Sequence, residues 1–141
     1  MSNNYLVGDI NPAFNVYNFT RRLQSVDISN NGLTTGSIPA ALFDSALFEE
    51  FIGGTNCYTG SIPTAICDAR SLRTLDISGM TASPSCRSRY TFPFDFYTAA
   101  VVPGEIPECI FNSESLQVIS LSGNGIRSSV YDLNPASKLS N

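Results

Sequence analysis

The strongest constraint on the fold is a motif that returns about every 24 residues along the chain. Its template is LxxLxLxxNxL, in which apolar residues alternate over a short strand and an asparagine follows. Copies of this template begin at Leu23, Phe48, Leu72 and Leu116. A period of roughly 20–29 residues is typical of arrays in which each coil packs only on its neighbours. The sequence therefore predicts a solenoid whose strands stack into one parallel sheet.

A second signature follows the strands. It reads Gly-x-Ile-Pro and occupies residues 36–39, 60–63 and 104–107, with a weaker version at 8–12. The glycine permits a turn, the isoleucine supplies an apolar anchor, and the proline ends hydrogen bonding and redirects the chain. These positions are expected to be scaffold.

Together the two signatures read NxLTGxIPxxL, which resembles the plant-type leucine-rich repeats of receptor-kinase ectodomains, receptor-like proteins, polygalacturonase-inhibiting proteins and similar algal proteins. The resemblance covers almost the whole chain apart from residues 81–101. It implies an α/β repeat solenoid, a right-handed superhelix of about five coils with a parallel concave β-sheet, one coil being interrupted by an aromatic insertion. Such repeats serve reception, inhibition and scaffolding alike, so the resemblance does not select a function.

The whole chain, residues 1–141, is expected to be one leucine-rich-repeat domain. A partial coil covers residues 1–22, full coils begin at residues 23, 48, 72 and 116, and a further coil begins at 139. Solenoids need polar caps over their terminal coils, and neither end carries a cysteine-rich cap. We therefore expect an internal piece of a longer solenoid.

Asparagines are expected to form a structural ladder where the chain leaves each strand. Asn31, Asn56 and Asn124 occupy this position, and their side-chain amides can bond backbone groups that the coils leave unpaired. In the copy that begins at Leu72, Met80 replaces the asparagine.

The period breaks after Met80, because Leu75 and Ile119 are 44 residues apart where about 24 are expected. The inserted segment, residues 81–101, is rich in aromatic and arginine residues. It either packs on the flank of the solenoid or presents these side chains to a partner, since such residues dominate interface hot spots. The candidate partner-binding residues are Arg87, Arg89, Tyr90, Phe92, Phe94, Phe96 and Tyr97.

Four cysteines allow three complete pairings, and sequence alone does not select one. Stacking of the coils favours Cys57 with Cys86 and Cys67 with Cys109, and four free buried thiols are the alternative. Because the chain has no histidine and no CxxC spacing, neither a metal site nor a cofactor is expected.

Asn18 begins an Asn-Phe-Thr glycosylation sequon. With paired cysteines, this sequon indicates the secretory pathway, as a secreted protein or a receptor-like ectodomain, with an organelle lumen as the alternative.

The exposed positions of the concave sheet are the second candidate binding surface. They are small, mostly hydroxylic and slightly acidic, which suits a protein, peptide or glycan partner, although a solvated, unused face is the alternative. A regular lattice for ice or mineral is disfavoured because acidic and apolar residues interrupt the columns. The positions are Ser25, Asp27, Ser29, Glu50, Ile52, Thr55, Thr74, Asp76, Ser78, Val118, Ser120 and Ser122.

Several functions are disfavoured by composition. A net charge of −4 with 14% charged residues offers no basic surface for nucleic acid, and no apolar run is long enough to span a bilayer. Without histidine or a nucleophile elbow, no catalytic residues are expected, and Asp27 and Asp76 read as exposed sheet residues. The sequence predicts a non-catalytic recognition module, or alternatively a structural or accessory subunit of a larger complex.

Overall fold

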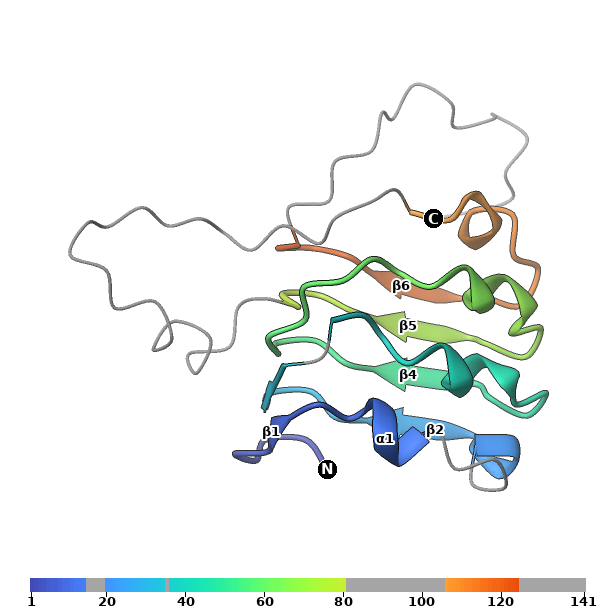
Figure 1. Ribbon diagram of the computed structural model, residues 1–141. Coiled ribbons are helices and arrows are strands. Elements are labelled where there is room, and N and C mark those ends of the chain that lie inside the picture. The colour runs from blue at the N-terminus through green and yellow to red at the C-terminus, as the bar shows by residue number, and fades with distance from the viewer. Residues whose placement is uncertain (15–19, 35, 81–105, 125–141) are drawn as a thin grey trace.

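The computed structural model describes residues 1–14, 20–34, 36–80 and 106–124, which form stacked coils (Figure 1). One wall of the stack is a four-stranded parallel sheet in the order β2-β4-β5-β6. Its strands are β2 (Ser25–Asp27), β4 (Glu50–Ile52), β5 (Thr74–Asp76) and β6 (Val118–Ser120).

The register of this sheet follows the sequence period. Val26 pairs with Phe51, Phe51 with Leu75, and Leu75 with Ile119, so the same position of each repeat copy lies in one column. Val26, Phe51 and Leu75 are buried, whereas the residues on either side of them are not. Each repeat copy is therefore one turn of the solenoid, which confirms the predicted repeat architecture.

A second, two-stranded parallel sheet joins the first part of the chain to the next coil. It pairs β1 (Val7–Gly8) with β3 (Gly32–Leu33), which follows the ladder asparagine. After β1 the chain forms the short helix α1 (Asn11–Phe14), which buries Phe14, and later the 3₁₀ helix η1 (Thr20–Arg22).

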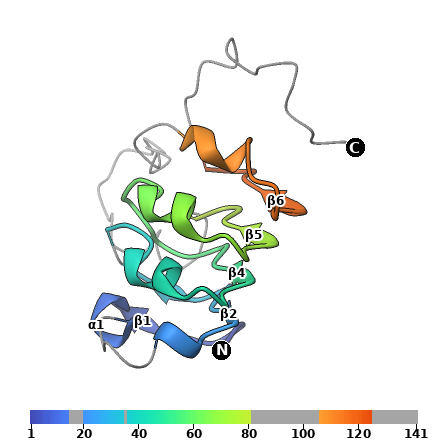
Figure 2. The ribbon, with the colours of Figure 1, turned by 90° about the vertical axis from the view of Figure 1, so that its right-hand side faces the viewer.

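The wall opposite the main sheet consists of 3₁₀ helices, as Figures 1 and 2 show. They are η2 (Ala40–Asp44), η3 (Thr64–Asp68) and η4 (Glu108–Ile110). Each begins directly after the proline of a Gly-x-Ile-Pro segment, and the proline carbonyl accepts the first i to i+3 hydrogen bond. Among the described residues the single α-helix is α1, so the helical layer of this α/β solenoid is built mainly from 3₁₀ turns.

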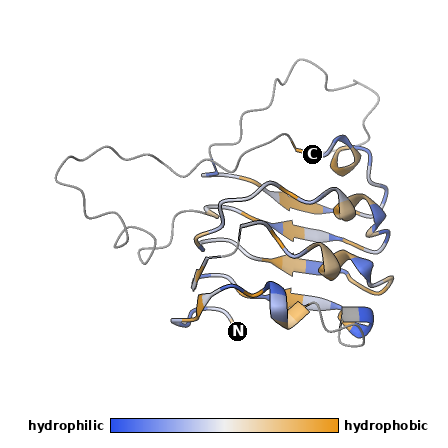
Figure 3. Cartoon of the chain, in the orientation of Figure 1, coloured by the Kyte–Doolittle hydropathy of each residue, from blue (hydrophilic) through white to orange (hydrophobic). Residues whose placement is uncertain are grey.

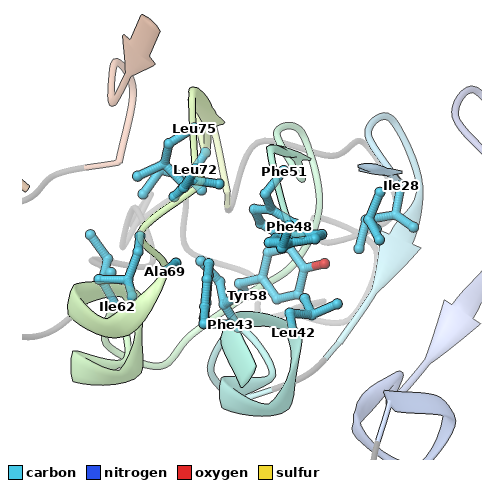
Figure 4. Packing of buried hydrophobic residues seen from close by; sticks show 14 of the residues in the cluster. Ile28, Leu42, Phe43, Phe48, Phe51, Tyr58, Ile62, Ala69, Leu72 and Leu75 are labelled. Atoms are coloured by element: carbon cyan, nitrogen blue, oxygen red, sulfur yellow. The ribbon is translucent and has the colours of Figure 1, made fainter. Parts of the chain in front are cut away.

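The core lies between these two walls, and the apolar residues along strands and helices supply it (Figure 3). In the coil that begins at Phe48 the core is aromatic: the ring of Phe43 lies edge-on to the rings of Phe48 and Phe51, with centroids 5.9 and 6.3 Å apart (Figure 4). Gly53 stands where the other copies carry an aliphatic residue. A Cβ on Gly53 would lie 2.6 Å from Cζ of Phe51, so the glycine makes room for the ring.

The ladder asparagines tie each coil to the one before it. Oδ1 of Asn56 accepts the N–H of Leu33 at 3.2 Å, and its Nδ2 donates to the carbonyl of Ile28 at 3.0 Å. Oδ1 of Asn31 and of Asn124 likewise accepts a backbone N–H from the preceding coil. All three side chains are buried, so these bonds satisfy backbone groups that water does not reach.

A disulfide joins Cys67 of η3 to Cys109 of η4, with Cα atoms 5.5 Å apart. This is one of the two pairs that stacking favoured. Cys57 is disulfide-bonded as well, and the prediction that Cys86 is its partner falls outside the described residues. The alternative of free thiols is wrong for these three described cysteines.

Candidate functional site

The solvent-facing side of the four-stranded sheet is the candidate site. We define the sheet face as three rows of residues that cross the strands, one residue per coil. The rows are Ser25, Glu50, Thr74 and Val118; Asp27, Ile52, Asp76 and Ser120; and Ser29, Gly54, Ser78 and Ser122. Every side chain in these rows is at least partly exposed, and the 3₁₀ helices lie on the opposite side of the stack (Figure 2).

Thr55 was predicted on the sheet face, and it is partly exposed. Continuing the pairing of Asp27, Ile52 and Asp76 by two residues puts Gly54 in line with Ser29 and Ser78, one residue before Thr55. Thr55 belongs instead to the turn after the strand, where its φ is 54° and the equivalent Asn30 has a φ of 52°.

Two aspartates on the sheet face are held in the same way. Oδ1 of Asp27 accepts the N–H of Ser29 at 3.0 Å and its hydroxyl at 2.7 Å. Oδ1 of Asp76 accepts the N–H of Ser78 at 2.9 Å and its hydroxyl at 2.7 Å. The sequence Asp-Ile-Ser occurs at both places, and the two hydrogen bonds fix the direction of each carboxylate.

The environment of Asp27 favours its ionised form. Partial burial alone would raise the pKa of this carboxyl, but hydrogen bonds from Ser29 and Ser2 and the nearby amino group of Met1 outweigh it, so the pKa is lowered. Asp27 is therefore an anion at neutral pH.

The middle coil separates the two aspartates. Ile52 lies between them in the row and is partly exposed. In the next row a Cβ on Gly54 would lie 2.6 Å from the carbonyl oxygen of Ser78 and 3.1 Å from its Oγ, so this position has no room for a side chain. The centre of the sheet face is thus the side chain of Ile52 beside the buried backbone of Gly54.

The first row adds a third carboxylate. Glu50 accepts the hydroxyl of Ser25 at 2.6 Å, and Val118 at the far end of the row is 53% exposed. Next to this row, Nε of Arg73 lies 3.7 Å from Oε2 of Glu49, both side chains being about half exposed. An exposed pair of this kind contributes little to stability, but it neutralises the charge at that border.

Other predicted site residues lie outside the described residues. These are Asn18 and the insertion candidates Arg87, Arg89, Tyr90, Phe92, Phe94, Phe96 and Tyr97. Within the described ranges, no group of three or more His, Cys, Asp or Glu side chains could hold a metal ion. None of the helices in the described part of the chain has the length and apolar character needed to cross a bilayer.

The structure also contains a cavity that sequence reasoning did not list as a site. It has a volume of about 540 Å³ and lies beside β2, with a lining that is mostly apolar and includes Leu6, Ile10, Phe14 and Val26. Near it, Val7 is 69% exposed. The sequence signal was the apolar run that contains Leu6 and Val7 ahead of the first full repeat copy.

Comparison with known families agrees with the repeat. Residues 22–44, which contain β2, β3 and η2, match the family model described as Leucine Rich Repeat. The chain resembles plant-type leucine-rich-repeat proteins. No curated protein matches this chain.

Solved structures share its fold, among them these two. One is the crystal structure of the BIR3–SERK2 complex from Arabidopsis thaliana, with a TM-score of 0.57, 22% identity, and coverage of 89% of this chain and 56% of that one. The other is the plant peptide hormone receptor RGFR1 in complex with RGF2, with a TM-score of 0.55, 23% identity, and coverage of 86% and 19%. The chain thus spans about half of the first neighbour and about a fifth of the second.

Proposed function

We propose that this leucine-rich-repeat chain is a non-catalytic recognition module that binds a protein, peptide or glycan partner through the sheet face. The observation that supports the proposal most is the pair of Asp-Ser arrangements, because Asp27 and Asp76 are held in fixed orientations on an otherwise open sheet. Groups that are already oriented lose less conformational entropy when a partner binds.

The structural neighbours support a protein or peptide as the partner. One was solved as a complex named for BIR3 and SERK2, and the other is a peptide hormone receptor bound to RGF2. By the same analogy, and with the Cys67–Cys109 disulfide, we place the chain outside the cell or in the secretory pathway. The insertion at residues 81–101 is proposed as a second contact surface on its sequence alone.

A non-catalytic role is supported by the chemistry of the acidic residues. The chain has no histidine to act as a general base. Asp27 and Asp76 are separated by the coil that carries Ile52, and the lowered pKa of Asp27 makes it a poor general acid at neutral pH.

Site-specific photo-crosslinking tests the proposal, because Lys138 is the single lysine and amine-reactive reagents would sample almost nothing of the chain. A photoreactive residue is placed at Thr74 on the sheet face, with Thr64, exposed on η3, as the matched control. We expect partner crosslinks from Thr74 in the native source that disappear when Ile52→Arg is added. Equal crosslinking from both positions, or none from Thr74, contradicts the proposal.

An accessory-subunit role is the second candidate, and the exposed apolar residues near the cavity favour it. Tyr5 is fully exposed, and Leu6 and Val7 are 40% and 69% exposed. A photoreactive residue at Val7 would then give one crosslinked product in fixed stoichiometry, and Ile52→Arg would leave it unchanged.

A further inference from the structure

The charge of the sheet face points to the chemistry of its partner. Its three ionisable side chains, Asp27, Glu50 and Asp76, are all acidic, and no lysine or arginine occurs in the three rows. Two described cations lie near it: Arg73 on its border is paired with Glu49, and the amino group of Met1 lies near Asp27. Three carboxylates against one unpaired amino group leave net negative charge on this side of the sheet, greatest towards Glu50 and Asp76, which favours a cationic ligand.

The spacing of the two aspartates restricts that ligand further. They lie in one row two strands apart, and with about 4.8 Å between neighbouring strands their separation is roughly 9–10 Å. In polyproline II conformation, three residues per turn and a rise of about 3.1 Å place side chains i and i+3 on one side, about 9 Å apart. Two cationic side chains with this spacing would reach Asp27 and Asp76 together.

The aspartates also keep acceptor capacity for a partner. An ionised carboxylate has about four acceptor sites, and Ser78 uses only Oδ1 of Asp76. At Asp27, Ser2 contributes a further hydrogen bond, so this carboxylate is the more occupied of the two. We therefore expect Asp76 to contribute more to binding than Asp27.

The space between the aspartates suits an apolar group. Ile52 is partly exposed there, whereas Gly54 beside it is buried and carries no side chain, so Ile52 is the group that a ligand meets between the two aspartates. Contact between a peptide and this centre would bury apolar surface on both sides.

We propose that the sheet face binds an extended peptide segment with arginine or lysine at positions i and i+3 and apolar residues between them, seated on Asp27, Ile52 and Asp76. This inference rests on the proposed function and names the class of partner for the same surface.

Amide chemical shifts of the ¹⁵N-labelled full chain test the inference with three probe peptides, acetyl-GRPLRG-amide, acetyl-GEPLEG-amide and acetyl-GQPLQG-amide. The basic probe is expected to shift the amides of Ser29 and Ser78, which donate to the aspartates, and to bind at least fivefold more weakly in 0.5 M than in 0.05 M salt. The acidic and neutral probes should leave both amides in place at the same concentration.

Variants then locate the site. Asp76→Asn is expected to weaken binding of the basic probe at least fivefold, and Asp27→Asn is expected to weaken it less. Asp68→Asn on η3 is the matched control and should leave binding of the probe unchanged. If Asp76→Asn alters the fold, which the same spectra report, Glu50→Gln replaces it as the test of charge, with an expected weakening of at least twofold.

Each contrary outcome has its own meaning. Equal shifts from the acidic or neutral probe would leave a peptide site and overturn the preference for cations. Shifts spread over the whole chain, or no shift of Ser29 and Ser78 with any probe at millimolar concentration, would overturn the inference. The photo-crosslinking from Thr74 decides the proposed function independently, because it requires no assumption about charge.

Discussion

Replacing Gly53 with alanine should destabilise this protein, although alanine normally suits a strand better than glycine. A Cβ at this position would lie 2.6 Å from Cζ and 2.7 Å from Cε1 of Phe51. That ring is fully buried, and the edge-on ring of Phe43 limits its movement. Neither ring can swing into solvent, so the core must shift to admit one methyl group.

The magnitude follows from two opposing terms. Overfilling a packed core costs about 1–3 kcal/mol. Replacing glycine restricts the unfolded chain and returns about 0.4–1 kcal/mol. We therefore expect Gly53→Ala to lower the free energy of unfolding by about 1.3 kcal/mol, the difference between the midpoints of these two ranges. Urea denaturation followed by far-ultraviolet circular dichroism would measure it, after the transitions of two probes have been shown to coincide.

Gly36→Ala is the matched control, because nothing lies within 4 Å of a Cβ built there. It should leave the stability unchanged or raise it by up to about 1 kcal/mol. Adding Phe51→Leu should then recover part of the loss in Gly53→Ala, with a coupling of about 1 kcal/mol between the two sites. If Gly53→Ala is as stable as Gly36→Ala, Gly53 and Phe51 do not compensate for each other.

Four further predictions concern other parts of the molecule. Thr55→Gly should raise the free energy of unfolding by up to about 1 kcal/mol, because a β-branched residue at a φ of 54° is strained; a lower urea midpoint would contradict this. Tyr58→Phe should leave the free energy of unfolding unchanged or raise it by about 1 kcal/mol, since the buried hydroxyl has no hydrogen-bond partner among the described atoms. A decrease of more than about 1 kcal/mol in the same assay would show that the hydroxyl has a hydrogen-bond partner. Asp27→Asn should lower the free energy of unfolding at pH 7. The loss relative to the native protein should shrink as the pH falls below about 4, because a carboxyl whose pKa is lowered by folding stabilises the protein only while it is ionised. A loss that does not change with pH would refute the lowered pKa of Asp27. Cys67→Ser should lower the free energy of unfolding by about 2–4 kcal/mol and speed amide hydrogen exchange in residues 106–124 more than in β2. Equal acceleration in both regions would show that the Cys67–Cys109 disulfide does not anchor residues 106–124.

Much of the fold could be predicted because the repeat encodes its own register. Val26, Phe51 and Leu75 occupy the same position of the repeat template. Because equivalent positions stack in a solenoid, the spacing of the repeats predicts which residues pair across the strands of the sheet. The 3₁₀ helices were not predicted, because the Ile-Pro turns show where the chain bends but not which hydrogen bonds it forms next. Helices of three to five residues are too short for a periodic pattern to appear in the sequence.

The candidate site was predicted less completely, for reasons that lie in single residues. The sequence does not reveal that Thr55 has a positive φ of 54°, or that Gly54 before it continues the third row without a side chain. The hydrogen bonds between Asp27 and Ser29 depend on a local chain direction that the spacing of two residues does not determine. Asp27 and Asp76 were recognised as exposed, but their fixed orientation became visible only with the backbone in place.

The large side chain of Phe51 is compensated by the absence of one at Gly53, and this compensation affects how the sequence of such a chain can change. The neighbouring coils keep an aliphatic pair at the same two positions, Val26 with Ile28 and Leu75 with Ile77. Because each coil touches only its neighbours, one coil can adopt a different solution without altering the others. A larger residue at one of these two positions then requires a smaller one at the other, while the strand pairing with the neighbouring coils stays the same.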